Sequence, residues 1–339
     1  MSKKGDRVGC RVVTFNAQGQ CGNMSGDTPY LEKLIQQMQK LKADIVVINE
    51  PGAVRKITPQ LRGIAERNQC TAVIRTGEEG TTEGTIVILT QAWRMVHEST
   101  QVINGKGLNT TRAIQLIFKE VGKQGRITPL NKLAVYAVYG YANKGKRAES
   151  KALWNAVKES IGKWRKQHPL SSTVLAGDLN AAKWSSIDTD RPDIEHEQQL
   201  EKDAETIIWI EKNTPLRDLY REKFPHQRGV TRTPQKGKAL TDAARRLDQI
   251  WATKEIANHP ATKIGIATSH DLGGDHMPVV ADLPIDCAGQ AEGTTPTWTP
   301  TTTKKLQLKP EEEVEPSDTV DYSMKFRWMY IANMVTTEN

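Results

Sequence analysis

The stretch TVLAGDLNAA (173–182) constrains the fold of this chain more than any other part of the sequence. Its apolar run ends at Gly177, and Asp178 and Asn180 then follow two positions apart. A buried strand that ends at a turn has this pattern. Because side chains alternate along a strand, we expect Asp178 and Asn180 to point towards the same place at the strand's end. Taken alone, such a turn is more often structural than functional, so the rest of the chain decides its meaning.

Other predicted strands also end at polar residues. The β-branched stretch Val8–Phe15 ends before Asn16, and the apolar stretch Asp44–Asn49 ends at Glu50, before a Pro-Gly turn. Further polar groups at strand ends or in neighbouring turns are Tyr139, Asp248 and the pair Asp275 and His276. If the strand ends converge on one rim of a sheet sandwich, these distant positions form a single pocket.

The order of predicted elements favours mixed sheets over a uniformly parallel sheet. Strands are also expected at 70–74, 84–89, 112–118, 133–141, 246–252, 263–267 and 277–283, and amphipathic helices at 30–41, 147–166 and about 195–211. Several of these strands follow one another without a helix, at about 70–118 and 246–283. We therefore expect an α/β fold in which mixed sheets pack face to face, with the helices outside.

The chain is basic, with a formal net charge of +7 over 339 residues. A basic body suits a polyanionic partner such as nucleic acid, although many basic proteins bind none. The segment 236–246 lies beside Asp248 and is the better candidate for holding a phosphate backbone, through Lys236, Lys238, Arg245 and Arg246. The basic helix expected at 144–166 is more typical of a solvated face.

The four cysteines are scattered, without a CxxC pair or a histidine at zinc-ligand spacing. This argues against a structural zinc and against a disulfide framework. The polar start lacks a secretion signal, and no apolar run is long enough to cross a membrane. We therefore expect an intracellular protein, nuclear or cytoplasmic, that is neither secreted nor membrane-bound.

Composition divides the chain into four parts. A polar tail at 1–7 precedes one large folded body at 8–286. Residues 287–320 are rich in Thr, Pro and Glu and are expected to form a disordered linker. The last part, 321–339, is apolar and aromatic again, and its role cannot be derived from its residues.

Six short motifs occur in an order that carries a family resemblance. They are FNAQG (15–19), INEP (48–51), VYGYAN (138–143), GDLNA (177–181), RRLDQIW (245–251) and GDHMPVV (274–280). The set resembles the endonuclease/exonuclease/phosphatase superfamily over nearly the whole body. The combination of Tyr139-Gly140, Arg147, Leu153-Trp154 and GDLN resembles most the apurinic-type endonuclease domain of non-LTR (LINE-type) retrotransposons.

The resemblance implies a four-layer α/β sandwich and a magnesium-dependent site, with Mn²⁺ as a possible substitute. Glu50 would be the principal metal ligand, and Asn16 would support the metal and the phosphate. Asp178 would orient or deprotonate the attacking water, while Asn180 would hold a phosphate oxygen. Carboxylate and amide oxygens suit Mg²⁺ better than zinc or copper.

The resemblance also assigns roles on the other side of the scissile phosphate. His276 would contact the phosphate as a charged donor, with its ring oriented by Asp248. Asp275 would add a second metal contact or support the site. Tyr139 would hydrogen-bond the phosphate, although the local register leaves Tyr141 as a substitute.

The chain departs from the family pattern at three places. Gln18 replaces an acidic residue that repair enzymes carry two positions after the first Asn, and Gly274 replaces the usual Ser before Asp-His. A Pro expected after the tyrosine is missing. The first two changes suggest looser metal binding or a relaxed substrate choice, and none removes a core catalytic group.

We therefore expect a Mg²⁺-dependent endonuclease that nicks DNA and leaves a 3′-hydroxyl that can prime reverse transcription. The chain contains no reverse-transcriptase motif, so such a module would lie in a longer polyprotein, or the chain is a free-standing relative. A phosphatase or phospholipase acting on inositol phosphates or lipids is an alternative, disfavoured by Ala181-Ala182-Lys183, where inositol phosphatases carry aromatic and Arg residues. A non-catalytic nucleic-acid-binding relative is a third, disfavoured because competent residues remain at all six motifs.

Overall fold

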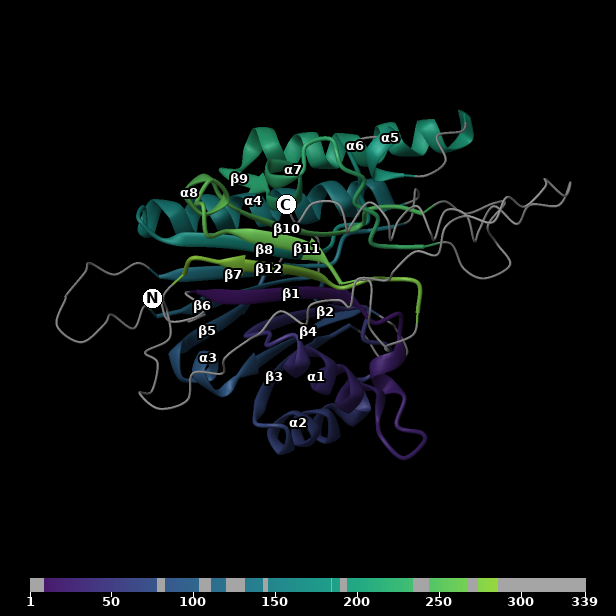
Figure 1. The fold of residues 1–339 in the computed structure, drawn as a ribbon, viewed down its shortest axis with the longest axis vertical. Helices are drawn as coiled ribbons and strands as arrows, with labels where there is room; N and C mark the ends of the chain where they lie inside the picture. Colours follow the sequence, from purple (N-terminus) through teal and green to yellow (C-terminus); the bar gives the residue numbers. More distant parts are fainter. Residues whose placement is uncertain are drawn as a thin grey trace, which may run out of the picture.

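Two six-stranded sheets pack face to face, and helices cover both outer faces (Figure 1). The computed structural model describes residues 9–77, 83–103, 111–119, 132–142, 146–183, 185–189, 194–233, 244–267 and 274–285. The four-layer α/β sandwich is therefore confirmed. The expected tail at 1–7, the linker at 287–320 and the segment 321–339 lie outside the described residues.

The first sheet has the strand order β11-β12-β1-β2-β4-β3. Its strands are β1 (Cys10–Asn16), β2 (Ile45–Asn49), β3 (Cys70–Thr76), β4 (Gly84–Thr90), β11 (Lys263–Ile266) and β12 (Val279–Leu283). Strands β1 and β2 run parallel and the other neighbours antiparallel, so the sheet is mixed as expected. Its outer face is covered by α1 (Tyr30–Lys40) and α2 (Thr58–Arg67).

The second sheet has the order β5-β6-β7-β8-β10-β9. Its strands are β5 (His97–Val102), β6 (Ala113–Phe118), β7 (Leu133–Val138), β8 (Ser172–Asp178), β9 (Leu216–Asp218) and β10 (Asp248–Thr253). The long helices α4 (Arg147–Gln167) and α6 (Ile194–Asn213) lie over its outer face. The short helices are η1 (Gln20–Gly22), η2 (Arg55–Ile57), α3 (Gln91–Val96), α5 (Ser185–Asp188), α7 (Leu219–Lys223) and α8 (Lys254–Ala257).

The alternation of side chains along each strand builds three apolar layers. In β1, Val12 packs in the core between the sheets, whereas Val13 and Phe15 pack under the helices of the first sheet. In β8, Val174 and Ala176 face the other sheet in the same way. Each large apolar side chain buried here contributes about 1.5–3 kcal/mol. The same alternation carries polar residues onto the inner face where these strands end.

The sequence pattern missed several short elements. Residues 70–118 were expected to hold consecutive strands, but α3 follows β4 directly and leads into the extra strand β5. Helix α2 was also missed, because its buried apolar side chains are few: Leu61, Ile64 and Ala65. Strand β10 begins at Asp248, two residues later than expected.

Among the described residues, no helix is long and apolar enough to cross a membrane.

The end of β8 approaches its neighbour β7 very closely. Gly177 has a φ of 155°, and a Cβ there would lie 1.8 Å from the backbone oxygen of Val138. Gly140 is similarly confined, because its Cβ would lie 2.0 Å from the backbone oxygen of Leu179. Only glycine fits at these positions, so the GDLN turn can sit against the end of β7.

We expect the change Gly177→Ala to destabilise the protein by at least about 3 kcal/mol, since backbone must move to admit the methyl group. The change Gly162→Ala is the matched control. Gly162 lies in α4, and an added Cβ would meet nothing within 4 Å beyond the adjacent residues and the backbone of its own helix, so alanine should stabilise the helix by about 1 kcal/mol. Urea unfolding of the three proteins measures both effects. Equal stability of the two variants would contradict the close approach at Gly177.

Candidate active site

Two buried asparagines of the first sheet hold the end of β8 in the second sheet. The side-chain oxygen of Asn49 accepts a hydrogen bond from the backbone N–H of Asp178 at 2.8 Å. The Asn16 amide nitrogen donates to Oδ2 of Asp178 at 2.7 Å. Both asparagines lie on inner strand faces and are buried, with Asn49 fully so. These bonds join the two sheets at the rim where β1, β2 and β8 end.

Glu50 stands beside this junction, directly after β2. Its Oε2 accepts hydrogen bonds from the Asn16 amide at 3.2 Å and from the hydroxyl of Tyr139 at 3.0 Å. The tyrosine is buried, and burial together with the charges of Asp178 and Glu50 raises its pKa far above the usual range. Tyr139 therefore stays protonated and donates at neutral pH, and of the two candidate tyrosines it is the one that reaches Glu50.

Arg112 holds this tyrosine in place and was missed by the sequence analysis. Its guanidinium lies between two rings, 4.3 Å from the centre of Tyr139 and 4.1 Å from that of Tyr141. It also donates to the backbone oxygen of Gly140 at 2.9 Å and to Glu83 at 2.8 Å. A charged group stacked on two aromatic faces in a buried place stabilises their orientation. The available signal was an arginine at the start of a strand, which is too common to interpret.

Asp178 and Asp248 lie directly opposite each other in the antiparallel pair β8 and β10. Both carboxylates are about 1% exposed. Burial, and then the charge of Asp248, raise the pKa of Asp178 to about 6. The carboxylate is thus poised to exchange a proton near neutral pH.

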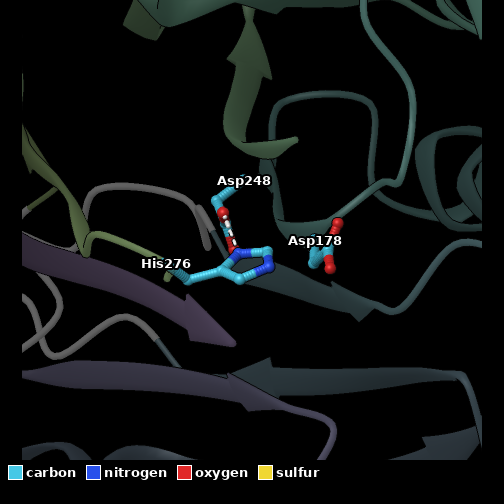
Figure 2. A group of neighbouring side chains, drawn as sticks. All are labelled: Asp178, Asp248 and His276. Atoms are coloured by element: carbon cyan, nitrogen blue, oxygen red, sulfur yellow. Dashed lines mark hydrogen bonds and ion pairs between the residues drawn. The ribbon is translucent and has the colours of Figure 1, made fainter. Parts of the chain in front are cut away.

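His276 lies beside both carboxylates (Figure 2). Its Nδ1 is 2.7 Å from Oδ2 of Asp248, as the sequence interpretation expected for an orienting pair. Burial alone would lower the pKa of the ring, but the charge and the hydrogen bond of Asp248 raise it to about 9. The ring is therefore charged at neutral pH, and Asp248 orients it through Nδ1.

Asp275 is held by neighbours on both carboxylate oxygens. Gln18 donates its side-chain N–H to Oδ1, and the Nε of Arg232 lies 3.2 Å from Oδ2. Oδ1 is 3.8 Å from Nε2 of His276. Of the two roles left open for Asp275, these contacts favour support of the site over metal ligation.

Asn180 lies beyond the end of β8, in the left-handed region with a φ of 50°. Strand alternation therefore does not govern its direction. Its backbone N–H donates to Oδ1 of Asp178 at 2.8 Å, and its side-chain nitrogen donates to the backbone oxygen of Gly140 at 3.1 Å. The backbone N–H of Asn180 is thus a second donor to the Asp178 carboxylate, in addition to the side chain of Asn16.

One of the four expected DNA-binding residues is in the wrong environment for that role. Arg246 is 1% exposed, and it forms ion pairs at 2.6 Å with both Asp188 and Asp218. It cannot reach a phosphate without breaking these buried pairs, so its assignment to the DNA interface was wrong. Arg245 is half-buried beside it. Lys236 and Lys238 lie outside the described residues.

The donor atoms gathered here fit a divalent cation. Carboxylate oxygens of Asp178 and Asp248 lie within 4.8 Å of each other and both residues are buried, while the charged ring of His276 beside them has no free lone pair for a metal. Among the described residues, Oδ1 of Asp248 has no hydrogen-bond partner, although it is buried. Glu50 adds a further carboxylate, half-buried at the same rim. A site dominated by oxygen donors suits a hard cation such as Mg²⁺.

Comparisons with known proteins support the fold of the chain. No protein-family model and no curated protein sequence matches the chain. Among solved structures, the AP endonuclease from Archaeoglobus fulgidus is similar with a TM-score of 0.60 and 18% identity, over 81% of this chain and 100% of that chain. The AP endonuclease from Leishmania major is similar with a TM-score of 0.63 and 14% identity, over 81% and 88%.

A third similar structure is a 3′ phosphatase from Neisseria bound to a product DNA hairpin. Its TM-score is 0.60 at 16% identity, over 81% of this chain and 99% of that chain. Sequence identity this low establishes the fold alone. The chain therefore shares its fold with these AP endonucleases and this 3′ phosphatase.

The raised pKa of His276 makes stability depend on pH in a defined window. Because the folded value, about 9, exceeds the unfolded value of 6.5, the contribution is complete below pH 6.5 and is lost as pH rises through about 9. We expect the parent's stability advantage over His276→Gln to shrink by roughly 2–3 kcal/mol between pH 6.5 and 9.5. Urea unfolding in chelator at several pH values measures this difference. A constant difference across that window would contradict the Asp248 pairing.

Proposed function

We propose that this protein is a metal-dependent phosphodiesterase that nicks DNA as an endonuclease. One observation carries the proposal: a buried carboxylate with a pKa near 6 and a charged imidazole lie side by side at the rim that also holds Glu50. Phosphodiester hydrolysis requires a base for the water, positive charge for the phosphate and a cation. The fold adds support, because one of the similar structures was solved with product DNA.

In this proposal each residue acts on a stated group. Asp178 accepts a proton from the water that attacks phosphorus, and its own position is fixed by Asn16, Asn49 and the backbone of Asn180. His276 donates through Nε2 to a phosphate oxygen while Nδ1 pairs with Asp248. The bond between phosphorus and the 3′ oxygen breaks, and the departing oxygen takes a proton from solvent, which leaves a 3′-hydroxyl and a 5′-phosphate.

Glu50 would hold the cation, with Asn16 and Tyr139 orienting its carboxylate through Oε2. When bound, the cation supplies positive charge to the phosphate and to the departing oxygen. Asn180 contributes its amide towards the phosphate, and Asp275 supports the loop of His276. Lys236, Lys238 and Arg245 remain the proposed contacts to the DNA backbone, without Arg246.

The finer role proposed here is target-site cleavage for a retrotransposon. It is supported by the sequence resemblance to LINE-type endonuclease domains and by the 3′-hydroxyl that the reaction would leave as a primer. A reverse-transcriptase module would then act next on the same DNA end.

Plasmid nicking tests the activity. We expect the protein to convert supercoiled plasmid to the open circle with Mg²⁺ or Mn²⁺, and to lose this activity in chelator, since the phosphate charge is then not neutralised. The nicked ends should prime a DNA polymerase without prior phosphatase treatment. Undiminished nicking in chelator would contradict the proposed requirement for a metal ion. Ends that need a phosphatase before extension would exclude the proposed direction of cleavage, and hydrolysis of soluble inositol phosphates alone would favour the phosphatase alternative.

We expect Asp178→Asn to reduce the nicking rate by at least about 100-fold, because the amide cannot accept the proton of the water. The change also removes one buried charge, so Glu66→Gln serves as the control for net charge. Glu66 is exposed on α2, outside the site, and its variant should nick at the parent rate. Initial rates at saturating Mg²⁺ give the comparison. Parent-like nicking by Asp178→Asn would remove this residue from the reaction.

A further inference from the structure

Gln18 makes a two-point contact with Asp275 across the site. Its side-chain oxygen accepts the backbone N–H of Asp275 at 3.0 Å, and its side-chain nitrogen donates to Oδ1 of the same residue. A backbone N–H can only donate, so it fixes which end of the amide faces it. The nitrogen of Gln18 therefore faces the carboxylate. The Gln18 side chain thus binds both the backbone and the side chain of Asp275.

The segment around Gln18 is itself tied to the catalytic rim. Its backbone N–H donates to the side-chain oxygen of Asn16 at 2.8 Å, which leaves the Asn16 nitrogen to face Glu50 and Asp178. Gln18 has a φ of 48°, so it stands in a turn that brings its side chain back over the site. Gln18 thus links the end of β1 to the loop that carries His276.

Gly274 makes room for this contact. It has a φ of 86°, and a Cβ on it would lie 2.5 Å from the side-chain oxygen of Gln18. A side chain at 274 would push the Gln18 amide away from the backbone of Asp275. The glycine and the glutamine are therefore adapted to each other.

The contact between Gln18 and Asp275 sets the position of the Asp275 carboxylate relative to Nε2 of His276. Oδ1 of Asp275 is 3.8 Å from Nε2 of the imidazole, too far for a hydrogen bond but close enough to form one after a small movement. The Gln18 amide holds this oxygen, and Arg232 lies 3.2 Å from the other. An Asp275 carboxylate released by Gln18 lies close enough to take Nε2 as its hydrogen-bond partner, and it would then occupy the nitrogen that faces the site.

We propose that Gln18 is a positioning residue that restrains the Asp275 carboxylate and so keeps Nε2 of His276 open for a substrate phosphate. The proposal rests on the function proposed above, because it assigns Nε2 to a phosphate oxygen. In this chain the contact requires an amide at position 18, because the nitrogen donates to the Asp275 carboxylate while the oxygen accepts its backbone N–H, and a carboxylate at that position has no proton to donate.

The change Gln18→Glu tests this requirement while conserving shape. We expect a loss of roughly 100-fold in the nicking rate constant, the scale of a small misplacement in a catalytic site. Gln20→Glu is the matched control: it adds the same charge two residues away, in η1, where the side chain is exposed, and it should behave as the parent. Binding of a labelled duplex in chelator should weaken about 10-fold in Gln18→Glu relative to Gln20→Glu, because a charge-assisted hydrogen bond to phosphate is lost.

The double change Gln18→Glu with Asp275→Asn exchanges the amide and the carboxylate. The amide introduced at position 275 can then donate to the carboxylate introduced at position 18, and the competing charge beside His276 is gone. We expect the double variant to nick at least about 10-fold faster than Gln18→Glu alone, since the polar pair is restored in reverse. A structural defect at Gln18 would not be rescued by a second substitution in the site.

Several outcomes would overturn the proposal. They are parent-like nicking by Gln18→Glu, equal losses in Gln18→Glu and Gln20→Glu, and a double variant no faster than the single one. If the parent protein does not nick DNA, the proposed function fails instead. In that case the pairing is still tested by thermal unfolding of the parent, Gln18→Glu, Asp275→Asn and the double variant, where non-additive midpoints support it and additive midpoints refute it.

Discussion

The two hydrogen bonds that Asp178 makes with Asn16 and Asn49, one accepted by its carboxylate and one donated by its backbone N–H, are the interactions on which the rest of the site depends. They cross from one sheet to the other, at the place where the apolar layer between the sheets ends. A buried amide or carboxylate without a partner costs several kcal/mol, so these groups are satisfied only when the two sheets are packed in register. The packing of the sheets and the geometry of the candidate site therefore form together in folding, and a sandwich displaced at this rim would lose both.

The charges of three ionisable groups buried at this rim also compensate one another. The register of β8 and β10 sets two buried carboxylates, Asp178 and Asp248, against each other. Two adjacent carboxylates without compensation would disfavour the folded state or take up a proton. The imidazolium of His276 supplies the compensation by pairing with Asp248, while burial and the charge of Asp248 still raise the pKa of Asp178 to about 6. The features that make the site chemically useful are thus the ones that allow three ionisable groups to be buried together.

The sequence predicted the strand ends well because their signal is local. An apolar run that stops at a polar residue identifies both the strand and the side chain at its end, and Asn16 and Asp178 lie where this pattern placed them. What it could not supply was the partner of each residue. Asn49 and Asp178 are 129 positions apart, and Arg112 meets Tyr139 only because β6 and β7 pair. Such contacts depend on register and on sheet packing, which no short window of sequence contains.

Arg246 shows why a basic residue beside an active site does not by itself indicate a nucleic-acid contact. Its guanidinium is enclosed by Asp188 of α5 and by Asp218, which caps α7, and Arg221 pairs with Asp188 in the same cluster. Buried ion pairs contribute little net stability, but removal of one partner leaves a buried charge at high cost. The cluster therefore fixes position more than it adds stability. Because Arg246 lies two residues before Asp248, the position it fixes is the entry of β10, and through it the carboxylate that orients His276.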